Sequence, residues 1–233
     1  LTVERSSSTK AALIYSMAGG TVDNCHSTGS VSTTGGLIWE TAVVSGTSSI
    51  LNSTNRNNCS GVSGECGGIV CQVGTSENYL ENCHNYGNIS GSYRVGGLVG
   101  RSTQNATAHL TVMRCSNRGN VTNPGTGNEA VVGGLVGQCS ATITYSYNMG
   151  DVDGRANTVA GITASGSASY CYNLGTITGG KNTSGARNLT VNGISSSAPS
   201  KCFNAGMVVN YSTGHAYALS SSGSTDCFNA GDI

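Results

Sequence analysis

Short stretches in which small or apolar residues alternate with polar ones recur along the whole chain. The clearest is residues 83–89, CHNYGNI, in which Cys83, Asn85, Gly87 and Ile89 fall on one side of an extended chain. Alternation with a period of two is the pattern of a β-strand that buries one face. No stretch carries the 3.6-residue period of an amphipathic helix over three turns. The pattern therefore predicts an all-β protein.

This phrase, Cys-x-Asn-x-Gly-x-Val/Ile, returns at a nearly constant interval. The interval is 115 − 83 = 32 between Cys83 and Cys115, and 227 − 202 = 25 between Cys202 and Cys227. Such a period is typical of stacked-repeat architectures. The good copies are 83–89, 115–121, 171–177, 202–208 and 227–233, with variants at 25–31 (Ser27 for Asn) and 146–152 (Ser146 for Cys) and a degenerate copy around Cys59.

A second phrase lies between these copies and is rich in glycine. It reads GGLVG at 96–100 and 133–137, with weaker versions at 35–38, 67–70, 160–162 and 192–194. Together the phrases predict coils of three short strands and three turns, with Gly supplying positive φ at the corner after the Asn. We expect insertions 123–129 and 179–188 to form loops on one edge.

The period predicts a β-solenoid (parallel β-helix) of about seven to eight coils, right-handed because parallel crossovers prefer that hand. Residues 1–233 form one domain in this interpretation, with 1–24 as an atypical first coil or cap. The chain stops inside a repeat, at Ile233, which suggests a fragment of a longer protein. The coil count and the strand spacing give a length of about 35 Å.

Stacking places the same repeat position of every coil in one column. We expect inward columns of buried, reduced thiols and of Asn side chains that bond one another and the backbone amides at the turn. The alternative is at least one disulfide, for which Cys59, Cys66, Cys71 and Cys139 are the better partners. The predicted structural ladder comprises Cys25, Cys83, Cys115, Cys171, Cys202, Cys227, Asn85, Asn117, Asn148, Asn173, Asn204 and Asn229.

Composition removes two classes of partner. The net charge is zero and only 9% of residues are charged, against about a quarter in ordinary domains. Nucleic-acid binding requires clustered Lys and Arg, and no cluster occurs. A membrane-spanning helix needs a long, unbroken apolar run. The sequence contains no such run, so it predicts no membrane span.

The paired phrases at 83–89 and 96–100, and at 115–121 and 133–137, resemble the GLUG-type repeats of bacterial cell-surface proteins. Those repeats occur in adhesin-like proteins of gut Firmicutes and Bacteroidetes and upstream of the catalytic region in streptococcal IgA1 metalloproteases. The resemblance covers nearly the whole chain after Cys25, with Tyr217-Ala218-Leu219 in place of the Gly-Gly phrase near the end. It implies an extracellular location, secreted or at the bacterial cell surface, and a structural or adhesive role.

Residues suited to catalysis are scarce. The four His are isolated, no His-Glu-x-x-His occurs, and the Cys66–Cys71 pair lacks a second pair at zinc spacing. Asp151 and Asp153 are the only close acidic pair, and the alternation points both toward solvent. We therefore expect no catalytic residue, metal site or cofactor, and no enzymatic activity. The alternative is a carbohydrate-active enzyme of the β-helix type, which requires a pair of carboxylates.

Outward neighbours of the Cys column form the best binding candidate. Stacked coils gather an aromatic patch with a cation at either edge, comprising Tyr145, Tyr147, Tyr170, Tyr172, Phe203, Arg114 and Lys201. Three interpretations stay open: a stabilising ladder, a contact with a partner chain or a missing segment, or a platform for a host or environmental glycan. The sequence thus predicts a non-enzymatic stalk or display scaffold, with end-to-end self-association through open coil ends as a further alternative.

Overall fold

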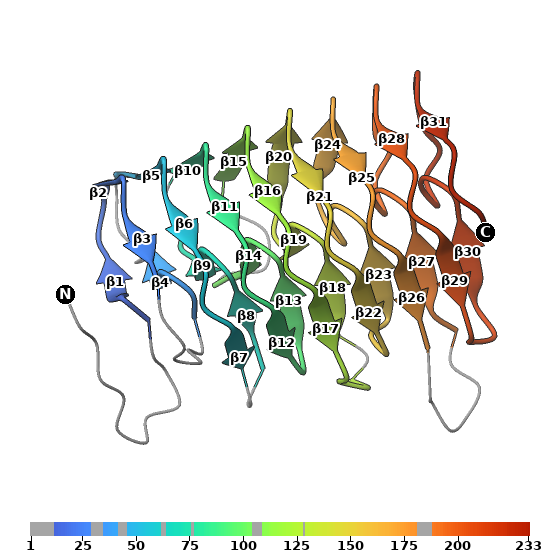
Figure 1. The fold of residues 1–233 in the computed structure, drawn as a ribbon, viewed down its shortest axis with the longest axis horizontal. Coiled ribbons are helices and arrows are strands. Elements are labelled where there is room, and N and C mark those ends of the chain that lie inside the picture. Colours follow the sequence, from blue (N-terminus) through green and yellow to red (C-terminus); the bar gives the residue numbers. More distant parts are fainter. Residues whose placement is uncertain are drawn as a thin grey trace.

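The computed structural model describes residues 12–28, 35–41, 46–61, 64–75, 77–103, 109–127, 129–180 and 188–233. Within these ranges every regular element is a strand, and all strand pairings are parallel. The strands stack into a β-solenoid with the N-terminal coils at one end and the C-terminal coils at the other (Figure 1). The predicted fold class is confirmed.

The coils contribute short strands to five sheets, which we call A to E, rather than to three as expected. Sheet A contains β1 (Ile14–Met17), β4 (Ile38–Thr41), β9 (Val70–Val73), β14 (Val99–Ser102) and β19 (Val136–Gln138). Sheet B contains β2 (Gly20–Asp23), β5 (Thr47–Leu51), β10 (Glu77–Glu81), β15 (His109–Met113), β20 (Ala141–Thr144) and β24 (Ser167–Ser169).

Sheet C carries the repeated Cys-Asn phrase. Its members are β3 (His26–Ser27), β6 (Thr54–Asn55), β11 (His84–Asn85), β16 (Ser116–Asn117), β21 (Tyr147–Asn148), β25 (Tyr172–Asn173), β28 (Phe203–Asn204) and β31 (Phe228–Asn229).

Sheets D and E follow along each coil. Sheet D contains β7 (Cys59–Gly61), β12 (Ile89–Gly91), β17 (Val121–Asn123), β22 (Val152–Gly154), β26 (Ile177–Gly179) and β29 (Val208–Asn210). Sheet E contains β8 (Cys66–Gly67), β13 (Arg94–Gly96), β18 (Val131–Gly133), β23 (Thr158–Ala160), β27 (Thr190–Asn192) and β30 (His215–Tyr217).

Sheets B, D and E have six strands each, so the solenoid makes about six turns, slightly fewer than the seven to eight expected. Residues 14–23 of the expected cap already belong to the stack, because β1 and β2 pair with β4 and β5. Residues 1–11 of the cap and most of the insertion at 179–188 lie outside the described residues. Tyr217 pairs with Asn192, so Tyr217-Ala218-Leu219 does replace the Gly-Gly phrase in the last coil.

A ladder of Asn side chains runs through the interior behind sheet C. The Asn117 Nδ2 donates to Asn148 Oδ1 at 2.8 Å, and Asn148 Nδ2 donates to Asn173 Oδ1 at 2.8 Å. Each Nδ2 also donates to the carbonyl two positions later, as Asn148 does to Gly150 O at 2.7 Å. The ladder therefore satisfies carbonyl oxygens at the turn, whereas the sequence interpretation assigned it backbone amides.

Thiols form a second ladder beside the first. The Cys115 Sγ donates to Met113 O at 3.2 Å, and it accepts the backbone N–H of Cys83 at 3.3 Å. Ser146 takes the same place, with its Oγ donating to Thr144 O at 2.8 Å. All ten cysteines are free thiols; Cys25 and Cys227, at the ends of the ladder, are half-buried and the other eight are buried.

The copy expected around Cys59 begins earlier in the chain than the sequence indicated. Ser53 occupies the ladder position, since its Oγ donates to Leu51 O and accepts the N–H of Cys25 at 3.1 Å. Asn55 then continues the Asn ladder, and Cys59 pairs with Ile89 in the Val/Ile column. A Ser at the anchor and an apolar Cys at the end of the phrase hid this copy in the sequence.

The left-handed corner of each coil precedes the ladder thiol. Among the residues that the structure describes, eight that are not glycine have φ between 48° and 53°: Asn24, Asn52, Asn82, Arg114, Tyr145, Tyr170, Lys201 and Asp226. The Gly of the phrase has no positive φ, which corrects the expected role. A Cβ on Gly150 would instead collide with the carbonyl of Gly119 in the preceding coil. Glycine is required there because consecutive coils approach closely.

The two phrases meet inside the solenoid. A Cβ on Gly97 would collide with the side chain of Asn117, and one on Gly134 with that of Asn148. The buried apolar residues form two clusters, one behind sheets A, B and C and one between sheets D and E. The described part of the chain contains no helix that could span a membrane.

Candidate binding face on sheet C

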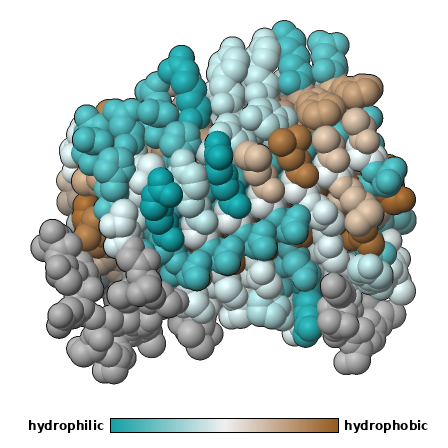
Figure 2. All heavy atoms as spheres, viewed as in Figure 1, coloured by the Kyte–Doolittle hydropathy of each residue, from teal (hydrophilic) through white to brown (hydrophobic). Residues whose placement is uncertain are grey.

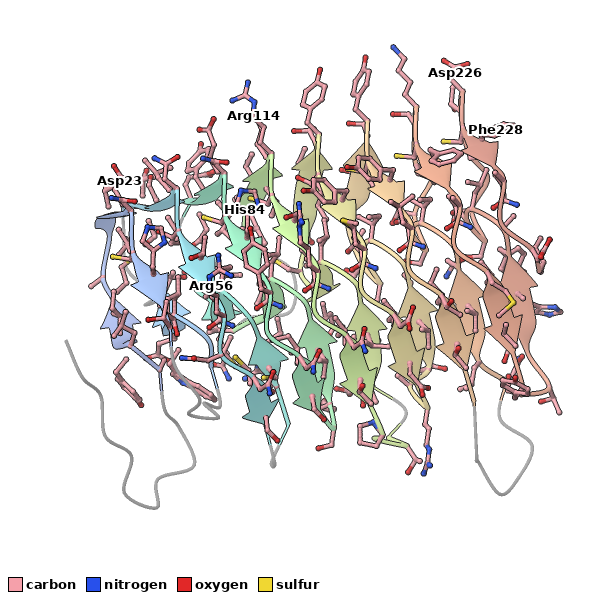
Figure 3. The ribbon with its side chains drawn as sticks, viewed as in Figure 1. Asp23, Arg56, His84, Arg114, Asp226 and Phe228 are labelled. Atoms are coloured by element: carbon pink, nitrogen blue, oxygen red, sulfur yellow. The ribbon has the colours of Figure 1, made fainter. Side chains whose placement is uncertain are left out.

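The candidate site is the outer side of sheet C, formed by the strand residues that do not join the interior ladders; all of them are at least partly exposed except Ser116, which is buried. The residue after each ladder position forms one outward column, which we call the face column: His26, Thr54, His84, Ser116, Tyr147, Tyr172, Phe203 and Phe228. The eight left-handed residues form a second column, the ridge, at the corner between sheets B and C. Figure 3 shows Arg114 and Asp226 projecting from this ridge, while Phe228 lies on the sheet.

The predicted aromatic residues lie on this face in two stacked pairs. The rings of Tyr147 and Tyr172 in the face column are 4.7 Å apart with an interplanar angle of 3°. Those of Tyr145 and Tyr170 on the ridge are 4.9 Å apart at 17°. Tyr145, Tyr170 and Tyr172 are exposed. The alternation read from the sequence therefore orients these side chains as expected.

Phe203 continues the face column and stacks on a ring that the sequence interpretation did not include. Its centroid is 5.7 Å from that of Phe228, which is 64% exposed. Three exposed aliphatic side chains follow the C-terminal strands of sheet C in the sequence: Met149 after β21, Leu174 after β25 and Met207 after β28. Apolar side chains thus gather over the C-terminal strands of sheet C, whereas its N-terminal half is polar (Figure 2).

Of the two expected cations, only Lys201 contacts a ring. Its Nζ donates to Tyr170 OH at 2.9 Å and lies 5.0 Å from the ring centroid. Arg114 instead pairs with Glu81, with its Nη1 2.7 Å from Oε1. Contact with Tyr170 raises the pKa of Lys201, so the ammonium group remains charged over the physiological range.

Sequence reasoning missed a third set of side chains, three positions after the ladder residue. Arg56, Tyr86 and Arg118 stack in consecutive coils, with the guanidinium carbons 4.5 Å and 5.6 Å from the Tyr86 centroid. Arg118 also donates from Nη2 to Tyr147 OH at 3.1 Å, which connects this column to the face column. The signal was available as the x in Asn-x-Gly, which alternation also places outward. Only the immediate neighbours of the Cys entered the prediction.

The charge of Arg118 affects two neighbouring groups in the face column, His84 and Tyr147. Burial lowers the pKa of His84, and the charge of Arg118 lowers it further. Burial acts to raise the pKa of Tyr147, but hydrogen bonds with Arg118 and Ser116 outweigh it and lower the pKa. His84 is accordingly neutral at pH 7, and its ring nitrogens lie 2.8 Å from Ser116 Oγ and 3.1 Å from Asn82 Oδ1.

Stacking determines what the rings present to a ligand. Because the Tyr147 and Tyr172 planes are almost parallel at 4.7 Å, each covers a face of the other. The stack therefore offers mainly ring edges and phenol groups to solvent, together with the donors of Arg118 and Lys201. Such a surface can contact polar and anionic groups through these donors, while the exposed aliphatic side chains nearby offer apolar contact.

The acidic pair of the sequence, Asp151 and Asp153, lies at the beginning of strand β22 in sheet D. Asp151 Oδ1 accepts the backbone N–H of Thr176 at 2.9 Å, continuing a surface ladder in which Asn120 Oδ1 accepts the N–H of Asp151. Asp153 lies in β22 on sheet D. Among the described residues, no group of three or more His, Cys, Asp or Glu side chains is placed to hold a metal ion.

Comparisons of the chain with protein-family models, with curated proteins and with solved structures find no match in any of the three.

Proposed function

We propose that this protein is a non-enzymatic repeat module, a stiff stalk that displays a ligand-binding face on sheet C. The single observation that carries the proposal is the clustering of exposed aromatic and aliphatic side chains over the C-terminal half of one sheet. Contiguous exposed apolar surface of this kind marks interaction sites on proteins.

The interior supports the role of a stalk. The Asn ladder connects neighbouring coils from Asn55 to Asn229. Eight strands in sheet C, at a spacing of about 4.8 Å, give a column about 34 Å long. The outward side chains on it are therefore held at fixed intervals, which limits the entropy lost when a ligand binds.

The resemblance of the repeats to those of bacterial surface proteins supports an extracellular setting, and we include that location in the proposal. A buried thiol column is compatible with it, because buried thiols are poorly accessible to oxidants.

A glycan array followed by variant binding tests the proposal. The double variant Tyr147→Ala/Tyr172→Ala should lose retention of the best array ligand while the melting temperature changes by less than about 2 °C. Tyr79→Ala provides the matched control, since Tyr79 is exposed on β10 of sheet B. If the stacks only stabilise the sheet, the double variant will instead melt markedly lower and keep its binding, and the proposal fails.

A further inference from the structure

The column of Arg56, Tyr86 and Arg118 has a charge imbalance that the fold does not neutralise. The ion pairs found among the described residues involve Arg94, Arg101 and Arg114, so neither Arg56 nor Arg118 faces a carboxylate there. Both are exposed. The net charge of the chain is zero, yet the face column and the Arg56–Tyr86–Arg118 column contain no Asp or Glu in any coil.

Tyr86 holds the two guanidinium groups in place. It lies between them, so that each cation contacts the π-system of the same ring. The two arginines are two coils apart, about 10 Å along the solenoid axis at the usual strand spacing. This spacing is fixed by the ladders beneath rather than by flexible loops.

Hydrogen-bonding capacity remains for a ligand. A guanidinium has five N–H donors in a planar fork that matches a carboxylate, and Arg118 uses one of them on Tyr147 OH. Since Tyr147 OH accepts that bond, its own O–H is left to donate. Tyr170 OH accepts from Lys201, so its own O–H is also left to donate, two coils beyond Arg118. The face thus presents donors in three parallel columns: Arg56 and Arg118 in one, Tyr147 in the face column, and Tyr170 and Lys201 on the ridge.

We propose that the Arg56–Tyr86–Arg118 column binds an acidic polysaccharide that lies along the solenoid axis, with carboxylates of its uronic acids on Arg56 and Arg118. The inference rests on the proposed function and names its ligand class. Tyr147 OH adds a donor next to Arg118, and Lys201 provides a further cation on the ridge, three coils beyond Arg118.

A sugar polymer fits this face better than an acidic peptide. A peptide that binds a sheet through its backbone adds a strand at an edge, where backbone groups are free. On the surface of sheet C the backbone groups are paired between coils, for example Tyr86 N–H with Asn55 O at 2.8 Å and Arg118 N–H with Asn85 O at 2.8 Å. A peptide lying across the strands would bury its own amides without partners. A polysaccharide keeps its hydroxyl groups in water or on the Tyr hydroxyls.

The test measures binding of sodium polygalacturonate, dextran and poly-L-glutamate to the full chain by calorimetry at low and high salt. We expect polygalacturonate to bind, dextran to show no measurable binding, and the affinity for polygalacturonate to fall as salt screens the charges. The double variant Arg56→Gln/Arg118→Gln should weaken binding at least tenfold at unchanged melting temperature. Arg114→Gln is the matched control and should change the affinity for polygalacturonate less than twofold, because Arg114 is already paired with Glu81.

Three results would overturn the inference: no binding of polygalacturonate, equal affinity for poly-L-glutamate, or full binding by the double arginine variant. The outcomes also separate the inference from the function beneath it. If a neutral glycan binds and its binding depends on Tyr147 and Tyr172, the acidic ligand class is wrong but the proposed binding function holds. If no array ligand binds at all, both fail.

Discussion

The two sides of sheet C are built from the same strands but obey different rules. Toward the interior, every complete phrase places a thiol or hydroxyl and then an Asn, and the hydrogen bonds of one coil repeat in the next. Toward solvent, the same strands change from His26 and Thr54 at one end to Phe203 and Phe228 at the other. The interior is uniform and the exterior graded.

The difference follows from what each side must satisfy. An Asn in the ladder is buried, donates to two acceptors and accepts from the previous coil, so a replacement leaves polar groups without partners. An outward side chain has water as an alternative partner, so the position tolerates many residues. The outward side chains can therefore vary to recognise a ligand. The constant inward side chains determine how the coils stack.

The strongest test of the comparison is a charge in the thiol ladder. Cys171→Asp should lower the free energy of unfolding by about 3–5 kcal/mol at pH 7, because it buries a carboxylate against the carbonyl oxygens of Ile143 and Ser169. Cys171→Ser should lower it by less than about 1 kcal/mol, since Ser146 already makes the ladder bonds in the preceding coil. Urea unfolding of both variants measures this. Equal stability of the two would mean that the column is not a buried ladder.

The next largest loss of stability is expected when a methyl group is added to a Gly of the Cys-x-Asn-x-Gly phrase. Gly150→Ala should cost about 1–3 kcal/mol, because the new Cβ collides with the carbonyl of Gly119 and the coils must separate. Gly127→Ala is the matched control; a Cβ there meets nothing within 4 Å, and the change should stay within about 0.5 kcal/mol. Thermal unfolding of the pair decides whether the phrase needs Gly for close approach. Similar melting temperatures for the two variants would refute the steric explanation.

The smallest expected change in stability concerns the ridge, where the backbone has a left-handed conformation and the side chains point to solvent. Arg114 has φ 53°, a conformation that Asn adopts more easily. In a Glu81→Gln background, which removes the ion pair, Arg114→Asn should stabilise the fold by about 0.5–1 kcal/mol. The comparison with Glu81→Gln alone isolates the backbone contribution in urea unfolding. A loss of stability would show that the Arg side chain matters beyond its charge.

Much of this fold could be read from local pattern. Alternation of Cys83, Asn85 and Ile89, and its return one repeat later from Cys115 onward, predict parallel coils with inward Cys and Asn columns. The same alternation oriented Tyr145, Tyr147, Tyr170 and Tyr172 outward. These predictions succeed because the direction of a side chain in a strand follows from its position alone.

Only the tertiary structure decided which groups meet between coils. The collision that makes Gly150 necessary involves a carbonyl of the preceding coil, and the column of Arg56, Tyr86 and Arg118 joins side chains from three separate copies. The pairing of strands between coils also identified the copy that begins at Ser53. This copy lacks the anchor Cys, but Ser53 makes the hydrogen bonds of the ladder. The sequence by itself determined the period and the inward and outward sides. The stacking determined corners, close contacts and charge partners, because these depend on distances between coils that no single repeat contains.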